Sequence, residues 1–141
     1  MKRYAPYLSY FVFGITLVST LVSLYFSEIL QFVPCILCWY QRIFMYPLVI
    51  ISAVSILRKQ TDLHYYALPF SIIGLLIAFY QNLLVWHVIP EQVAPCVNGV
   101  SCIEQPLVLF GFMTIPLGSM IAFALITISM LLYGRYFANK K

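Results

Sequence analysis

The sequence predicts an all-α fold, an integral membrane four-helix transmembrane bundle with two extracytoplasmic loops that carry the cysteines. Of the 141 residues, 63% are hydrophobic and only 9% are charged, whereas soluble domains carry about a quarter charged residues. The apolar residues gather in four long runs separated by short polar segments. This composition excludes a water-soluble domain, and we expect residues 1–141 to form a single membrane domain.

The first two runs differ in length. Residues 4–27 carry no charge. This run is longer than the about 20 helical residues needed to cross the hydrocarbon layer. Bulky residues follow them where a signal peptide would have a small-residue cleavage site, so we expect a retained spanning helix over 5–26. The second uncharged run, 43–57, is too short to span unless the helix extends backward past Arg42. A helix over 40–57 is the prediction.

The last two runs complete the bundle. Residues 65–89 are uncharged, and their apolar character is interrupted only late in the run, by Gln81, Asn82 and His87. Pro90 follows the run, so a helix over 66–89 is predicted. Proline is favoured at the first position of a helix, so we expect the fourth helix to begin near Pro116 and to cover 115–136. The connections are then extracytoplasmic loops over 27–39 and 90–114 and a cytoplasmic loop over 58–65.

The basic residues predict how the bundle is oriented. Seven of the eight fall on one side of the predicted bundle, and only Arg42 falls on the other, together with three of the four acids. Because Lys and Arg favour cytoplasmic loops, both termini of this multi-pass chain are expected in the cytoplasm. The net charge of +4 is therefore a topology signal, and no nucleic-acid partner is expected. The seven residues are Lys2, Arg3, Arg58, Lys59, Arg135, Lys140 and Lys141.

A Cys-x-x-Cys pair marks the start of the second helix. Cys35 and Cys38 are followed by Arg42, four residues after Cys38 and seven after Cys35, and both spacings return to nearly the same face of a helix. A fixed positive charge on that face, together with the N–H groups of a helix N-terminus, favours the reactive thiolate. This stretch therefore indicates redox chemistry.

A second pair, Cys96 and Cys102, lies in the other extracytoplasmic loop around an Asn-Gly turn signal that folds the segment back. Two pairs on the oxidising side predict a thiol–disulfide relay that passes electrons from a partner dithiol to the second pair, then to the first pair and to an acceptor in the membrane. Structural disulfides remain an alternative. A zinc site fits poorly because the side is oxidising and Arg42 would repel a cation, so no metal is expected.

Each of the other polar residues in the spans has a structural interpretation beside a functional one. Arg42 is either the residue that serves a bound acceptor or an interfacial anchor. His87, near the outer end of the third helix, is a candidate cofactor-binding residue or an interfacial polar residue. Gln81 and Asn82 are expected to be interhelical hydrogen-bond partners rather than ligands.

The run CILCWYQR at 35–42, continuing to Met45-Tyr46-Pro47, resembles the signature of the DsbB family of membrane disulfide oxidoreductases. Within that family, the Pro95-Cys96…Gly99…Cys102 segment and Phe110-Gly111-Phe112…Pro116 are similar to the shorter BdbC type of Bacillus-like bacteria. The resemblance covers nearly the whole chain. Longer members separate the second pair by a larger segment, whereas only five residues intervene here.

The resemblance implies an enzyme, a quinone-dependent protein disulfide oxidoreductase, that re-oxidises a DsbA-like or BdbD-like thioredoxin-fold oxidase and reduces menaquinone or ubiquinone. By motif position, Cys38 is the thiol beside the quinone, and Arg42 polarises the quinone. Cys35 exchanges with the second loop through Cys102, and Cys96 forms the mixed disulfide with the partner. Two alternatives stay open: a non-enzymatic, disulfide-stapled tetraspan interaction protein, and the same relay run in the reductive direction.

Overall fold

The described residues form four long helices and one very short sheet. The computed structural model describes residues 5–31, 36–59, 62–88, 108–109 and 113–138. All four helices are long and apolar enough to cross a membrane, so the predicted all-α, four-helix fold is confirmed. The elements are α1 (Ala5–Glu28), α2 (Ile36–Arg58), α3 (Leu63–Val85), β1 (Val108–Leu109), β2 (Met113–Thr114) and α4 (Ile115–Ala138).

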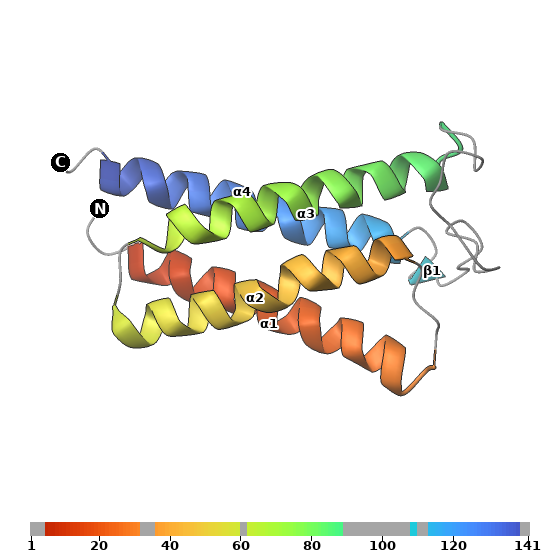
Figure 1. Cartoon of the computed structure of the whole chain (residues 1–141), viewed down its shortest axis with the longest axis horizontal. Helices are drawn as coiled ribbons and strands as arrows, with labels where there is room; N and C mark the ends of the chain where they lie inside the picture. The colour runs from red at the N-terminus through yellow and green to blue at the C-terminus, as the bar shows by residue number, and fades with distance from the viewer. Residues whose placement is uncertain (1–4, 32–35, 60–61, 89–107, 110–112, 139–141) are drawn as a thin grey trace.

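The helices run alternately up and down the long axis of the bundle (Figure 1). Each helix packs on the next in the chain, and α4 closes the ring by packing on α1. The start of α1 and the end of α4 lie at one end, whereas the start of α2 and the end of α3 lie at the other. The two strands precede α4 and pair antiparallel, with Val108 opposite Thr114 and Leu109 opposite Met113. The sequence patterns did not predict this two-residue ladder.

Two helix ends differ from the expected bounds for identifiable reasons. Helix α2 begins at Ile36 rather than at 40, which supplies the length that its uncharged run lacks. Helix α3 ends at Val85 rather than at 89 because His87 adopts the left-handed region, with φ 54°. The His87 N–H donates to the Leu84 carbonyl at 3.0 Å, and the Val88 N–H donates to that of Leu83 at 3.1 Å. This is the hydrogen-bond pattern of a Schellman cap.

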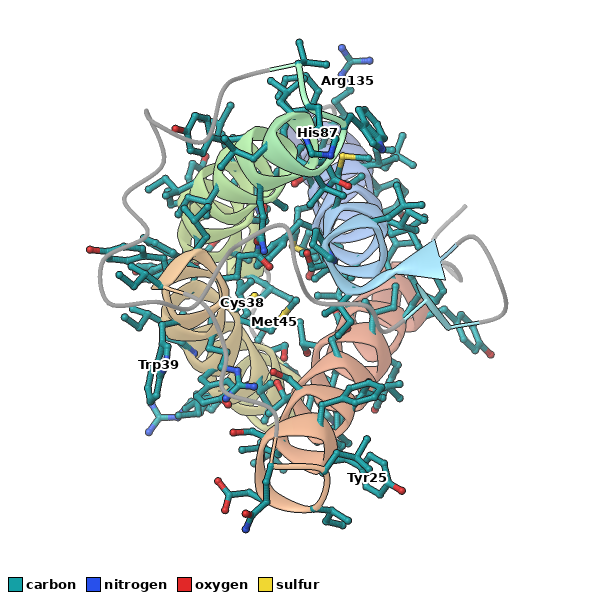
Figure 2. The ribbon with its side chains drawn as sticks, turned by 90° about the vertical axis from the view of Figure 1, so that its right-hand side faces the viewer. Tyr25, Cys38, Trp39, Met45, His87 and Arg135 are labelled. Carbon is teal, nitrogen blue, oxygen red and sulfur yellow. The ribbon has the colours of Figure 1, made fainter. Side chains whose placement is uncertain are left out.

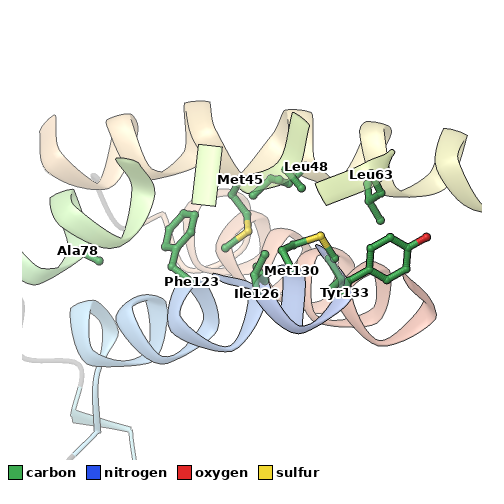
Figure 3. Close-up of a cluster of buried hydrophobic side chains, with 10 residues drawn as sticks. Met45, Leu48, Leu63, Ala78, Phe123, Ile126, Met130 and Tyr133 are labelled. Carbon is green, nitrogen blue, oxygen red and sulfur yellow. The ribbon is translucent and has the colours of Figure 1, made fainter. Parts of the chain in front are cut away.

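A cluster of buried apolar side chains fills the middle of the bundle (Figure 3). Phe123, Ile126 and Met130 of α4 are fully buried, and Met45 and Leu48 reach them from α2. Dispersion contacts of this kind, rather than a hydrophobic driving force, hold helices together in lipid.

Gly74 of α3 permits a close approach within this cluster. A Cβ atom at Gly74 would overlap the ring of Phe123, whose Cζ would lie 2.5 Å away. Small residues at helix contacts allow backbones to come together in membranes. The absence of a side chain at this position is therefore what lets α3 and α4 pack around Phe123.

Candidate functional site

Cys38 lies in the first turn of α2, at the end of the bundle where α1 and α3 end (Figure 1). It is half-buried and packs, with Ile77 and Tyr80, against the buried side chains of Leu37 and Leu84. Viewed from this end, Cys38 points into the bundle, whereas Trp39 points away from it (Figure 2). The sulfur therefore sits at the inner face of α2, near one end of the spans.

Two buried glutamines form a chain of hydrogen bonds that reaches this sulfur. Gln81 Nε2 of α3 donates to Cys38 Sγ at 3.3 Å, and Gln41 Nε2 of α2 donates to Gln81 Oε1 at 2.7 Å. Gln81 is only 1% exposed and Gln41 only 7% exposed. Because buried amides must be paired, the two bonds fix the direction in which the Gln81 N–H group points.

Arg42 sits one helical turn after Cys38 and reaches toward α1. Its Nη2 donates to the backbone carbonyl of Ser23 at 3.0 Å, and its guanidinium carbon lies 6.0 Å from the centroid of the Trp39 ring. The side chain is half-buried. The bond to Ser23 uses one of the five N–H donors of a guanidinium. The structure therefore places the positive charge at the contact between α1 and α2.

His87 occupies the cap of α3 rather than the interior of the bundle. Its side chain is exposed, and in Figure 2 it lies well apart from Cys38. A non-glycine residue in the left-handed region is uncommon, and histidine is among the residues that tolerate it better than most. The backbone role in the Schellman cap accounts for the position of His87 without a ligand.

The expectation that Gln81 and Asn82 bridge helices is confirmed. Gln81 bonds to α2, as described, and Asn82 Nδ2 donates to the carbonyls of Ala78 at 2.8 Å and of Pro116, on α4, at 3.0 Å. The contact of Gln81 with the sulfur of Cys38 was not anticipated. The available signal was a pair of amides in an apolar span, a costly placement that by default suggests function.

Three of the four predicted cysteines, Cys35, Cys96 and Cys102, lie outside the described residues. Their pairing and order of exchange therefore stay predictions. The described geometry brings together Cys38, Gln81 and Gln41, places Arg42 on the α1 side of the same helix, and leaves His87 at the surface.

Comparison of the sequence with known proteins assigns this chain to a family. The family model described as "Disulfide bond formation protein DsbB" matches residues 6–133. Disulfide bond formation protein C of Bacillus subtilis (strain 168) is 45% identical over 124 residues, covering 84% of this chain and 86% of that protein. A probable disulfide formation protein C 2 of Bacillus cereus is 46% identical over 110 residues, covering 78% of each.

The similarity extends beyond Bacillus. A probable disulfide formation protein of Chlamydia pneumoniae is 38% identical over 130 residues, covering 92% of this chain and 93% of that protein. No solved structure matches the chain. With a family model over most of its length, and with four helices able to span a membrane, the chain belongs to the DsbB family of disulfide bond formation proteins.

Proposed function

We propose that this protein is a membrane thiol–disulfide oxidoreductase that re-oxidises a DsbA-like or BdbD-like thioredoxin-fold oxidase and passes the electrons to menaquinone or ubiquinone. The observation that carries the proposal is Cys38 itself. This residue is half-buried in the first turn of α2, and its sulfur accepts an N–H bond from a buried amide. A sulfur held in this way is suited to exchange electrons with an acceptor dissolved in the bilayer.

The exchange steps balance in bonds and electrons. A thiolate of the partner attacks Cys96, the Cys96–Cys102 disulfide breaks, and Cys102 leaves as a thiolate. The second thiolate of the partner attacks the mixed disulfide and releases the oxidised partner with Cys96 reduced. Cys102 then attacks Cys35, and Cys38 leaves with the electron pair of the broken bond. Cys96 attacks the resulting Cys35–Cys102 disulfide, which re-forms the Cys96–Cys102 disulfide and releases Cys35 as a thiolate. Cys35 and Cys38 are then a dithiol, whose two electrons and two protons a bound quinone would accept as the Cys35–Cys38 disulfide re-forms. Each step needs a good attacking and a good leaving thiolate.

The residues present near Cys38 fit a quinone. A quinone supplies a two-electron, two-proton acceptor with carbonyl oxygens that accept hydrogen bonds. Arg42 is half-buried, and its bond to Ser23 uses Nη2, which leaves further N–H donors of the five on a guanidinium for such an oxygen. Cys38 and Arg42 are the residues that would hold it, because the fixed charge favours an anionic acceptor beside the sulfur. His87 is a weaker candidate, since its side chain is exposed.

The orientation proposed for the chain is that of a bacterial plasma-membrane protein with both termini in the cytoplasm and residues 1–141 in one domain. Arg58 ends α2, and Arg135 lies in the last turn of α4, at the end of the bundle opposite to Cys38. The positive-inside rule puts that end in the cytoplasm. Cys38 is then on the oxidising side, where disulfides persist.

The test uses the purified full-length protein in detergent, mixed with a reduced thioredoxin-fold oxidase with and without a quinone. Partner thiols and quinone absorbance are followed together. We expect two thiols to be lost for each quinone reduced, and no turnover with Cys35→Ser. Oxidation of quinol with reduction of the partner would reverse the direction. The absence of turnover, with all four cysteines staying oxidised, would favour the stapled tetraspan protein.

A further inference from the structure

We propose that Gln81, oriented by Gln41, is a positioning residue that holds Cys38 in its thiolate form. The feature behind the proposal is the directed chain of amides across the contact between α2 and α3. Gln41 donates to the oxygen of Gln81 at 2.7 Å, and the nitrogen of Gln81 donates to the sulfur of Cys38 at 3.3 Å.

The direction of this chain decides which form of the sulfur it favours. A side-chain amide has one accepting and one donating end. Because the accepting end of Gln81 is occupied by Gln41, its donating end is presented to the sulfur. A donor favours the charged, accepting thiolate over the neutral thiol. A neutral thiol sulfur is only a weak acceptor of the same N–H bond, whereas a charged acceptor makes a stronger one.

Burial of the donor strengthens the bond between Gln81 and Cys38. Gln81 is 1% exposed and Gln41 is 7% exposed, and Leu37 and Leu84 of the surrounding cluster are buried as well. In such a site the bond competes with little water, so a donor to a charged acceptor contributes more than it would at a surface. The same apolar surroundings would otherwise disfavour a charged sulfur, which is the effect that the amide offsets.

Other ionisable side chains stand at this end of the described bundle. Tyr80 of α3 packs in the same cluster as Cys38, and Arg42 of α2 directs its guanidinium to Ser23 of α1. The first turn of α4, residues 115–119, contributes none. The substitutions below retain all of these groups, so their contribution cancels in the comparison. The remaining ionisable groups there are exposed: Tyr25, Glu28, Tyr40 and His87.

The consequence for the relay, which depends on the proposed function, is a better leaving group. When a thiolate attacks Cys35, the Cys35–Cys38 bond breaks and Cys38 takes the electron pair. A thiol with a lower pKa leaves faster. The amide donor of Gln81 is in place to receive that developing charge without reorganisation.

The experiment measures the thiol alone, so that failure of the relay cannot affect it. In the full-length chain, Cys35, Cys96 and Cys102 are replaced by Ser, and the rate of Cys38 alkylation by iodoacetamide is followed against pH. Gln81→Met keeps the size of the side chain but removes the donor. We expect its midpoint to move to higher pH, with about tenfold slower alkylation at pH 7.

Two further variants separate the donor from general packing. Gln41→Met keeps the Gln81 amide but frees its orientation, and should shift the midpoint in the same direction by a smaller amount. It carries the test alone if Gln81→Met does not fold. Asn82→Leu removes a neighbouring buried amide that bonds to Ala78 and Pro116, and should leave the midpoint unchanged. Unshifted midpoints in both glutamine variants, or an equal shift with Asn82→Leu, would overturn the proposal.

Discussion

At the scale of single residues, this bundle places polar groups where lipid-facing helices usually avoid them. Gln41, Gln81 and Asn82 are buried in spanning helices, and Arg42 is half-buried. Burying a polar group costs free energy unless it is hydrogen-bonded, and all four make bonds between helices. Gln41 and Gln81 are the two whose bonds form one chain with the sulfur of Cys38.

The role of Arg42 can be separated from its contact with α1. We predict that Arg42→Ala slows quinone reduction on the order of a hundredfold, as for the loss of one preorganised donor. Exchange between the partner and the cysteines should stay largely intact, because the guanidinium is not needed there. The measurement is single-turnover loss of partner thiols without quinone, compared with quinone absorbance in steady state.

Two control variants test whether the effect of Arg42→Ala is specific to the guanidinium group at this position. Arg42→Lys retains the charge but not the fork of donors and should restore only part of the rate. Arg58→Ala removes an arginine at the far end of α2 and should leave both steps unchanged. Equal loss of both steps in Arg42→Ala would mean that the bond to Ser23 has a structural role.

At the scale of helices, the contact between α3 and α4 depends on Gly74. We predict that Gly74→Ala lowers the free energy of unfolding by about 1–3 kcal/mol, the usual cost of overpacking. The new methyl group would overlap the fully buried ring of Phe123, which has little room to move. Thermal unfolding in detergent, followed by circular dichroism, measures the effect.

A glycine elsewhere in the bundle provides the matched comparison. A Cβ at Gly14 of α1 would meet nothing within 4 Å, so Gly14→Ala should be neutral or slightly stabilising, since alanine is the better helix former. The double variant Gly74→Ala, Phe123→Leu should recover part of the loss. If Gly74→Ala unfolds at the same temperature as Gly14→Ala, the close approach does not limit packing.

The helices also show which structural features could be predicted from sequence patterns and which could not. Helix number and apolar character were predictable because each span is a long run of apolar residues. The exact start of α2 at Ile36 and the end of α3 at Val85 were not predictable from hydrophobicity. The end of α3 depends on a cap in which the backbone of His87 adopts the left-handed conformation, and hydrophobicity carries no information about it. Residue type indicated that Gln81 bridges helices, but only the packing of α2 on α3 selects Gln41 and Cys38 as its partners.

At the scale of the whole molecule, the up-and-down arrangement places Cys38 and its glutamine partners at one end of the bundle. The start of α2 and the end of α3 meet there (Figure 1), so Cys38 and Gln81, 43 residues apart in the chain, become neighbours. Because the basic residues Arg58 and Arg135 occupy the other end, we expect charge to orient the bundle and thereby to decide which compartment Cys38 faces.

This orientation yields a prediction that does not depend on activity. In a chain whose four native cysteines are replaced by Ser, Glu28→Cys at the end of α1 and Lys59→Cys after α2 place single thiols at opposite ends of the bundle. We expect a membrane-impermeant maleimide to label Glu28→Cys in cells with an intact plasma membrane, and Lys59→Cys only after permeabilisation. The reverse pattern would mean that Cys38 faces the reducing cytoplasm, where disulfides rarely persist, and it would contradict the proposed orientation.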